Sequence, residues 1–251
     1  MSNVLEGKIA LVTGATRGLG RALAQGLAEA GASIVVSSRK ADACEATARE
    51  ITASTGVRTL ALPLHVGDWD AIAPALARVE DELGLLDIVV NNAGIAPQSP
   101  SLLEHTEALY DKTMQVNLKG PFRLMAVAGE QMVRGGGGSI INISSIGSQR
   151  PGPSEATYTA AKAGLNALTM SFAQEYAPTV RVNCIMPGAF ATDMSADWDE
   201  EFVGLVVDGL PAGRLGQPAE LTGMVVHLAS DASSYTTGAV IPIDGGRLAV
   251  F

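Results

Sequence analysis

Short apolar runs alternate with longer amphipathic stretches along the whole chain. The runs are continuous and rich in β-branched residues, as expected of strands that are buried on both faces of a parallel sheet. The expected strands are Lys8–Thr13, Ser33–Ser37, Thr59–Val66, Leu86–Asn91, Ser139–Ser144, Val180–Met186 and Ala239–Ile243. The amphipathic stretches predict helices at Leu19–Ala30, Ala41–Thr52, Asp68–Leu83, Thr106–Arg134, Thr157–Tyr176 and Pro218–Ser230.

This alternation predicts one α/β domain over residues 1–251, a Rossmann-like, doubly wound parallel sheet of about seven strands with helices on both faces. One segment departs from this alternation of strands and helices. Ala189–Gly216 follows a strand, is acidic, and carries Trp198 and Phe202. Because such sheets bind ligands beyond the carboxyl ends of their strands, we expect this segment to be a substrate lid. With the loop Ile95–Glu104 it should wall a partly apolar pocket, whose expected residues are Ile95, Pro97, Phe190, Met194, Trp198 and Phe202. The alternative is that Trp198 and Phe202 pack the lid onto the body of the protein.

Composition and charge mainly exclude classes of protein and kinds of site. Apolar residues make up 47% of the 251 positions, and the formal net charge is -9. Nucleic-acid binding needs clustered Lys and Arg, so that class is disfavoured. No apolar run reaches the ~18 residues of a membrane span, and no signal-peptide core precedes the first strand. Cys44 and Cys184 lack the spacing of a metal or disulfide site. We expect a cytoplasmic protein without a metal.

A glycine-rich turn, TGATRGLG at residues 13–20, follows the first expected strand and opens into a helix. Glycines let a pyrophosphate approach backbone N–H groups at a helix N-terminus, where the helix dipole favours negative charge. A tight strand–helix connection is the structural alternative, but the position after a strand and before a helix favours a dinucleotide site. The expected contacts are Gly14, Thr16, Arg17, Gly18, Leu19 and Gly20.

The end of the second expected strand bears on which dinucleotide is bound. An NAD site is expected to place a carboxylate there for the ribose 2′-OH, and this chain instead has Ser37-Ser38-Arg39-Lys40. Arg39 could bind a 2′-phosphate bidentately, with Arg17 approaching from the glycine turn. The pattern therefore favours NADP(H) over NAD(H), with Ser38 and Arg39 in contact. The alternative is that Arg39 and Lys40 are merely solvated at a helix start.

Tyr158 and Lys162 are four residues apart on an expected helix and therefore share a face. A phenol with a pKa near 10 exchanges protons poorly at pH 7, and a neighbouring ammonium should lower that pKa. An ordinary surface pair would have the same spacing, so the pair alone is weak evidence. Ser145 strengthens the hypothesis, because it ends a strand just upstream and its hydroxyl could donate to a substrate oxygen.

Asn117 adds a further signal. It lies midway along the expected helix Thr106–Arg134, where Asn is unfavourable, and Gly120 and Pro121 follow it. We expect a local distortion here that frees a backbone carbonyl or seats a water molecule. A buried hydrogen-bonding Asn is the structural alternative.

Together these motifs closely resemble the short-chain dehydrogenase/reductase family, and the resemblance runs from Gly7 to Gly246. It rests on the glycine-rich turn, Asn91-Asn92-Ala93-Gly94, Asn117, Ser145, the Tyr158–Lys162 pair, and Pro187-Gly188 with Thr192. Ser145 precedes Tyr158 by the spacing that the family pattern expects. One position departs from it: His65 stands where the family usually has Asp or Asn against the adenine.

The resemblance implies a role for each matching residue. Tyr158 would exchange the proton with the substrate oxygen, Ser145 would orient that oxygen, Lys162 would hold the nicotinamide ribose and lower the pKa of Tyr158, and Asn117 would anchor a water relay. Asn92, Ala93 and Gly94 would line the adenosine and ribose channel, with the Val66 backbone at the adenine. Pro187, Gly188 and Thr192 would contact the nicotinamide.

The implied activity is that of an NAD(P)(H)-dependent oxidoreductase that interconverts a carbonyl and a secondary alcohol of a small molecule. Such enzymes are commonly homo-oligomers, tetramers or dimers, paired through the two long helices. A 3-oxoacyl-carrier-protein reductase-like activity and a catalytically silent nucleotide-binding relative are the alternatives. Dehalogenating relatives lose the glycine-rich turn, and enoyl reductases space Tyr and Lys further apart than four. The sequence leaves the substrate open.

Overall fold

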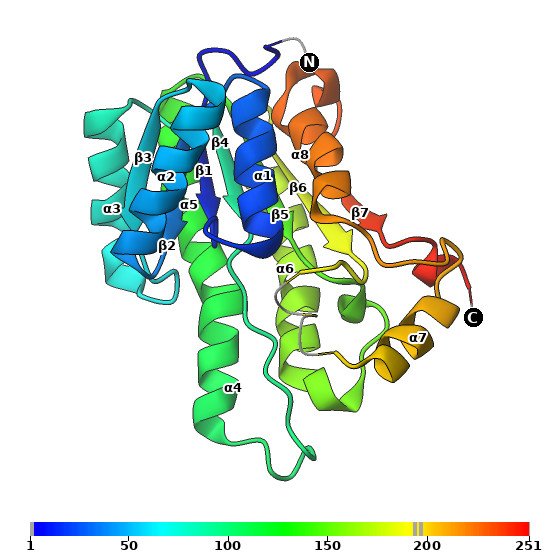
Figure 1. Cartoon of the computed structure of the whole chain (residues 1–251). Helices are drawn as coiled ribbons and strands as arrows, with labels where there is room; N and C mark the ends of the chain where they lie inside the picture. The colour runs from blue at the N-terminus through cyan, green and yellow to red at the C-terminus, as the bar shows by residue number, and fades with distance from the viewer. Residues whose placement is uncertain (1–2, 193–194, 196–197, 251) are drawn as a thin grey trace.

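Seven parallel strands form one sheet in the order β3-β2-β1-β4-β5-β6-β7 (Figure 1). The computed structural model describes residues 3–192, 195 and 198–250. The strands are β1 Ile9–Thr13, β2 Ser33–Ser38, β3 Thr59–Pro63, β4 Ile88–Asn91, β5 Gly138–Ile143, β6 Val180–Pro187 and β7 Val240–Ile243. The predicted doubly wound parallel sheet is confirmed, and its order reverses between β1 and β4.

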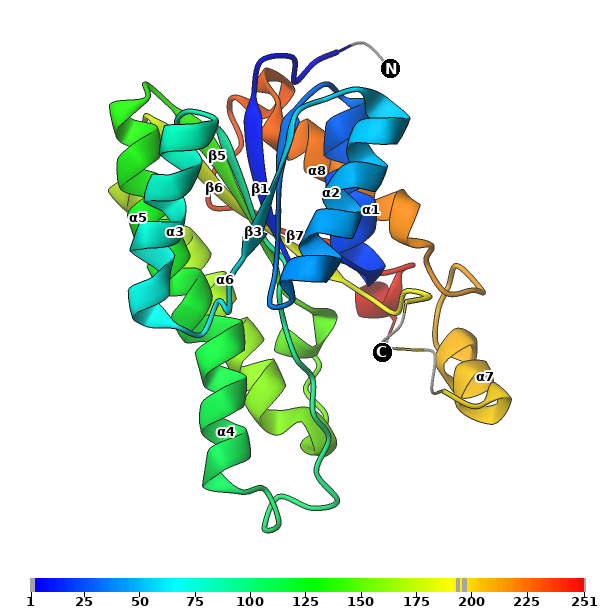
Figure 2. The same ribbon diagram turned by 60° about the vertical axis from the view of Figure 1, so that its left-hand side comes forward.

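Helices cover both faces of this sheet (Figure 2). One face carries α1 Gly18–Glu29, α2 Ala41–Thr55 and α8 Thr222–Ala229, and the other carries α3 Trp69–Glu82, α5 Gly120–Arg134 and α6 Ala156–Glu175. Neighbouring strand residues point to opposite faces. On β1, Ala10 and Val12 join the first core and Leu11 joins the second. Burial on both faces explains why the strands read as continuous apolar runs.

The expected helix Thr106–Arg134 contains the predicted distortion. It consists of α4 Glu107–Met114, a π-helical turn Gln115–Lys119, and α5. The N–H of Gly120 donates to the carbonyl of Gln115, five residues back, as a π-helical turn requires. Wider turns of this kind often occur at functional sites, and this one places Asn117 fully inside the protein.

Two other segments differ from the expected elements. The third strand ends at Pro63, before Val66, because the chain turns there and the N–H of Asp68 donates to the carbonyl of His65. The stretch expected as one helix from Pro218 begins with a 3₁₀ turn, Pro218–Leu221, and continues as α8. Further 3₁₀ turns lie at Ile146–Ser148, Pro153–Glu155, Asp231–Ser233 and Arg247–Ala249.

The insertion Ala189–Gly216 contains a helix that the sequence pattern did not predict, α7 Glu200–Asp208. Asp199 caps its N-terminus by accepting a hydrogen bond from the N–H of Phe202. None of the nine residues of α7 is buried, and the helix lies apart from the layers around the sheet (Figures 1 and 2). Within the described ranges, no helix is long and apolar enough to cross a membrane.

Candidate active site

The residues singled out by the sequence gather at one edge of the sheet, where the parallel strands end. The glycine-rich turn follows β1, Asn92–Gly94 follow β4, and Ser145 follows β5. Strands β1 and β4 are neighbours although they are far apart in the chain, so the loops after them diverge to opposite faces. That divergence makes the crevice in which doubly wound folds bind nucleotides.

The glycine-rich turn leaves room for an anion at the start of α1. Gly14 and Gly18 have φ values of +66° and +53°, a region that favours glycine. A Cβ atom on Gly20 would collide with the Gly14 carbonyl and the Asn92 side chain. The N-cap residue Arg17 makes no side-chain capping bond, and the first turn of α1 has no acidic residue. The turn therefore fits a pyrophosphate.

Thr13 ties this turn to the segment after β4. Its Oγ1 accepts hydrogen bonds from the N–H groups of Asn92 and Ala93, both at 3.0 Å. The Asn92 side chain donates to the Thr13 carbonyl at 2.9 Å. Thr13 was not among the expected contacts, although it opens the glycine-rich motif. Its role is to hold two walls of the crevice together.

Neighbouring loops complete the wall on the β2 and β3 side. Thr16 Oγ1 donates to Ser38 Oγ at 3.2 Å, so the glycine-rich turn touches the end of β2. Arg39 follows and is exposed. After β3, the N–H of Gly67 donates to Nδ1 of His65 at 3.1 Å. Val66 is buried, and a Cβ atom on Gly120 would collide with its carbonyl, so this loop packs against the π-helical turn.

Asn117 joins three parts of the site. Its Nδ2 donates to the carbonyls of Ile95, at 2.8 Å, and Thr113, at 2.9 Å. Its Oδ1 accepts from the N–H of Ile95 at 3.1 Å. The carbonyl of Thr113, four residues back, is thus bound by a side chain. Gly94 lies between Asn117 Oδ1 and Lys162 Nζ, since a Cβ atom there would meet them at 2.8 and 3.6 Å.

Tyr158, Ser145 and Lys162 also come together. Ser145 lies close enough to Tyr158 for its side chain to lower the pKa of the phenol, and Ser145 Oγ accepts from the N–H of Gly147 at 3.1 Å. Lys162 is buried, and its Nζ lies 5.7 Å from the centroid of the Tyr158 ring. That Nζ donates to the carbonyl of Ile143 at 2.7 Å. The structure therefore brings the four expected catalytic side chains to one place.

The pKa of Tyr158 differs from the sequence-based expectation. Although the side chain is partly exposed, burial around its hydroxyl raises the pKa to about 12, and the hydrogen bond with Ser145 lowers it less. Burial also lowers the pKa of Lys162 to about 8. The expected lowering of the Tyr158 pKa by Lys162 is absent, because the ammonium is bonded to a backbone carbonyl and desolvation prevails.

The insertion begins at this edge. Pro187 ends β6, and the N–H of Gly188 donates to the carbonyl of Ile243 on β7 at 2.9 Å. Thr192 stands against the glycine-rich turn, 3.7 Å from where a Gly18 Cβ would lie. Phe190 is buried and pairs with Gly216 in a bridge that closes the neck of the insertion. Phe190 therefore packs at the neck of the insertion.

The aromatic residues near the tip of the insertion pack on each other. The rings of Trp198 and Phe202 meet edge to face at 5.1 Å, and Phe202 is 44% exposed. Met194, which the sequence placed in the pocket wall, lies outside the described residues.

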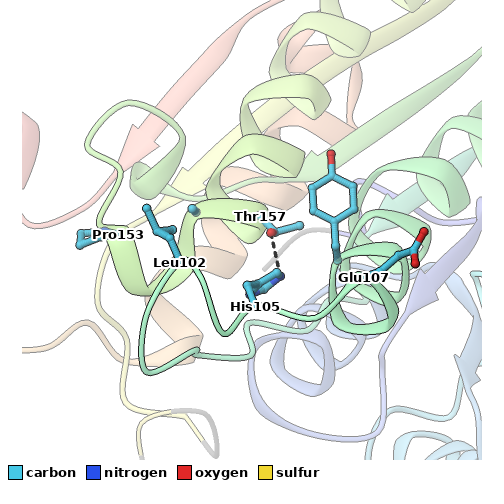
Figure 3. A pocket seen from close by; sticks show the side chains of 7 residues that line it. Leu102, His105, Glu107, Pro153 and Thr157 are labelled. Atoms are coloured by element: carbon cyan, nitrogen blue, oxygen red, sulfur yellow. Dashed lines mark hydrogen bonds between the residues drawn. The ribbon is translucent and has the colours of Figure 1, made fainter.

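A groove lies beside the first turn of α6, next to this centre (Figure 3). It is lined by Leu102, His105, Glu107, Tyr110, Pro153, Ala156 and Thr157. His105 crosses it, with its Nε2 2.9 Å from Thr157 Oγ1 and its Nδ1 bonded to Ser99 Oγ. This ring ties the loop after β4 to the residue that precedes Tyr158. Sequence reasoning missed His105, whose isolated position gives no signal.

Comparisons with known proteins agree with this arrangement. The family model described as enoyl-(acyl carrier protein) reductase matches residues 14–247. A 2-dehydro-3-deoxy-D-gluconate 5-dehydrogenase from Escherichia coli is 40% identical over 249 residues, 98% of this chain and 97% of that protein. A 3-oxoacyl-[acyl-carrier-protein] reductase from Aquifex aeolicus is 35% identical over 243 residues, 96% of this chain and 98% of that protein.

A solved structure is equally similar. The gluconate 5-dehydrogenase from Burkholderia cenocepacia, in complex with NADP and tartrate, superposes with a TM-score of 0.94 at 34% identity, covering 98% of this chain and 97% of that one. The chain therefore belongs to the short-chain dehydrogenase/reductase family. It is an NAD(P)-dependent oxidoreductase of the type that interconverts carbonyls and alcohols.

Proposed function

We propose that this enzyme is an NADP(H)-dependent dehydrogenase that acts on a small hydroxy acid or its keto form, with Tyr158 as the proton-transferring group. The observation that carries the proposal is the joint placement of Tyr158, Ser145 and Lys162 beside the glycine-rich turn. Bound in the crevice, the nicotinamide cofactor supplies the hydride. The protein supplies orientation and the proton.

The proposed proton transfer uses the hydroxyl groups of Tyr158 and Ser145. The Tyr158 and Ser145 hydroxyls lie near each other, so a substrate oxygen bound beside them would accept from both. With its pKa raised to about 12, Tyr158 is a neutral phenol at pH 7. That is the form that can donate a proton to a carbonyl oxygen as negative charge develops there. The geometry therefore supports carbonyl reduction, with Ser145 orienting the oxygen.

Lys162 and Asn117 shape the part of the crevice around the substrate oxygen. Lys162 Nζ is fixed by the Ile143 carbonyl and faces Gly94, which places it toward the crevice where a nicotinamide ribose would lie. With a pKa near 8 it remains mainly an ammonium at pH 7. Asn117 fixes Ile95 and Thr113, and so shapes the loop that opens beside Gly94. We propose that Asn117 anchors the path by which a proton returns to Tyr158.

The preference for NADP(H) rests on the loop after β2. Arg39 is exposed at the end of that strand, Thr16 binds Ser38 beside it, and no carboxylate stands in Ser37–Lys40. A guanidinium can bind a 2′-phosphate bidentately. We expect Arg39→Ala to weaken NADPH binding at least tenfold more than NADH binding. Lys40→Ala is the matched control, and equal losses for both cofactors in Arg39→Ala would refute the preference.

The substrate class is inferred from the relatives and from the charge of the insertion. Several similar proteins are gluconate-type dehydrogenases, and others are carrier-protein reductases. A carrier protein is acidic and needs free cations, yet Arg214 is held bidentately by Glu220, at 2.7 and 2.6 Å. Asp199 and Glu200 add negative charge at the start of α7. These features favour a small free acid over a protein-bound acyl chain.

A substrate screen tests this proposal. Gluconate and related sugar acids with NADP⁺, and acetoacetyl thioesters with NADPH, would be followed at the nicotinamide absorbance. We expect turnover with a sugar acid. After correction for the equilibrium constants of the oxidation and the reduction, kcat/KM for the thioester should be at least tenfold lower than for the sugar acid. Turnover with the thioester alone would replace the assignment by the carrier-protein reductase activity. Absence of any turnover with intact NADPH binding would favour a silent nucleotide-binding protein.

We also propose that two copies of the chain pair through α5. Its outer surface has exposed Phe122 and Val133, and Arg123 and Glu130 line one groove beside it. Arg123 and Glu130 lie equally far on either side of the bond between Ala126 and Val127. A two-fold axis there would place each Arg123 against the Glu130 of the second copy.

Sedimentation velocity can test this pairing. Glu130→Arg should shift the enzyme toward monomers by setting two guanidinium groups against each other. The double variant Arg123→Glu/Glu130→Arg should recover the oligomer, because the attraction returns with the signs exchanged. Oligomers in Glu130→Arg as stable as those of the wild type would exclude this surface.

A further inference from the structure

The end of helix α7 is attached to the C-terminal segment of the chain by the side chain of Arg247 and, three residues beyond the helix cap, by a backbone hydrogen bond. Arg247 NH1 donates to the carbonyl of Gly209, the C-cap residue of α7, at 2.9 Å. A cation at this end of a helix also interacts favourably with the helix dipole. None of the nine residues of α7 is buried and only Val203, Val206 and Val207 are partly buried, so packing holds the helix weakly. A directional contact of this kind therefore has a large influence on where the helix lies.

Arg247 also contacts the loop that carries Ser145. Arg150, five residues after Ser145, donates from its guanidinium to the carbonyl of Arg247 at 2.7 Å. The N–H of Ala212 donates to the carbonyl of Gly245 at 2.9 Å. The tail itself is folded around Asp244, whose carboxylate accepts from the N–H groups of Gly246 and Leu248. One residue thus joins α7, the tail and the Ser145 loop.

Gly209 shows that this contact requires space. Its φ of -86° is open to any residue, so backbone conformation does not demand glycine here. A Cβ atom at this position would instead collide with NH1 of Arg247. The flat guanidinium occupies the volume that a side chain would fill. An Ala at position 209 would push the guanidinium away with little strain, since the displaced atom is the far end of a flexible side chain.

We infer that Arg247 is a positioning residue for substrate binding, which fixes α7 relative to the Ser145 loop through the carbonyl of Gly209. The inference rests on the proposed function in one respect, that the insertion borders the substrate. It predicts that the contact affects the KM for substrate more than kcat, because Tyr158 and Lys162 are held by the sheet and α6. It also predicts unchanged cofactor affinity, since the glycine-rich turn lies at the other end of the insertion.

Two variants break the contact from opposite sides. Arg247→Ala removes the donor, and Gly209→Ala displaces it. Gly204→Ala is the matched control, because it adds the same methyl group to the same helix at a position with nothing within 4 Å. Hydrogen exchange of the amides of Phe202–Asp208 reports the position of α7 without substrate. NADPH binding and kinetics with gluconate and NADP⁺ complete the measurements.

We expect α7 amides to exchange about tenfold faster in Arg247→Ala and Gly209→Ala, as loss of a charge-assisted hydrogen bond implies. Amides of α8 should be unaffected. The KM for gluconate should rise about three- to tenfold with kcat within twofold, and the double variant should be no worse than either single one. Unchanged α7 exchange, additive effects, or an unchanged KM with faster exchange would each overturn the inference. If the wild type does not turn over gluconate, the substrate proposal fails, and exchange still decides whether the contact fixes α7.

Discussion

Helices α6 and α7 are held in opposite ways. The inner face of α6 is buried, including Leu165 and Phe172, and it rests on the sheet. Helix α7 has apolar residues too, but none is buried, and its C-terminal end is held by Arg247. The proposed proton-transferring group thus lies on the firmly packed element, and the segment proposed to face the substrate lies on the loosely held one. Chemistry and specificity can then change independently.

Removing the Tyr158 hydroxyl should give the largest effect. Tyr158→Phe keeps the ring and its packing but removes the proton donor, so kcat should fall about 10²–10⁴-fold. NADPH affinity, measured by fluorescence titration, should stay within about threefold, because the glycine-rich turn is untouched. Turnover within tenfold of the wild type would show that another group transfers the proton.

Two leucines test the comparison of the helices directly. Leu165 of α6 is fully buried, and Leu205 of α7 is 67% exposed. Leu165→Ala should lower the free energy of unfolding by about 2–5 kcal/mol through a cavity in the core. Leu205→Ala should change it by less than about 0.5 kcal/mol. Urea unfolding followed by circular dichroism measures both, and equal losses would mean that α7 is packed as firmly as α6.

Burial of Lys162 should make stability depend on pH. Its pKa is lowered from 10.5 to about 8, so between these values the unfolded chain binds a proton that the folded chain does not. The free energy of unfolding should therefore rise with pH from about 8 to 10 relative to Lys162→Met, by up to roughly 3 kcal/mol. Urea unfolding of both proteins at several pH values provides the test. Parallel pH profiles would contradict the shift.

The smallest expected effect is a difference in stability between glycine-to-alanine substitutions at two positions. In α7, Gly204 has open space around it, so Gly204→Ala should stabilise the protein by up to about 1 kcal/mol through helix propensity. In α6, a Cβ atom on Gly164 would lie 3.1 Å from side-chain atoms of Leu118. Gly164→Ala should therefore gain less, or lose stability. A larger gain at Gly164, measured by thermal unfolding, would show that α6 has room to spare.

Much of the fold and the site follows from local sequence signals. Buried parallel strands need apolar residues on both faces, so each continuous apolar run predicted a strand. The glycine-rich turn was predictable because the close approach of a pyrophosphate requires residues without a side chain. Asn117 signalled the π-helical turn because Asn and the following Gly and Pro disfavour a regular helix. These signals are strong because the chain itself must satisfy them locally.

What the sequence could not predict depends on contacts between distant residues. Helix α7 has only nine residues, and its partly buried positions Val203, Val206 and Val207 make too short a stripe for the sequence pattern to stand out. The contact between Arg247 and Gly209 joins a tail to an insertion, and neither residue indicates the other. The high pKa of Tyr158 arises from burial in three dimensions, which an i,i+4 spacing with Lys162 does not reveal.

The π-helical turn has a consequence for the length of this chain. A π-helical turn contains one residue more than an α-helical turn, so removing one residue from Gln115–Lys119 would allow α4 and α5 to continue as one regular α-helix, in which a backbone N–H four residues on bonds the Thr113 carbonyl. Asn117 could then no longer reach both Ile95 and Thr113. Deletions in this stretch should be far more damaging than substitutions of similar size. The site thus depends on the number of residues between two helices as well as on their identity.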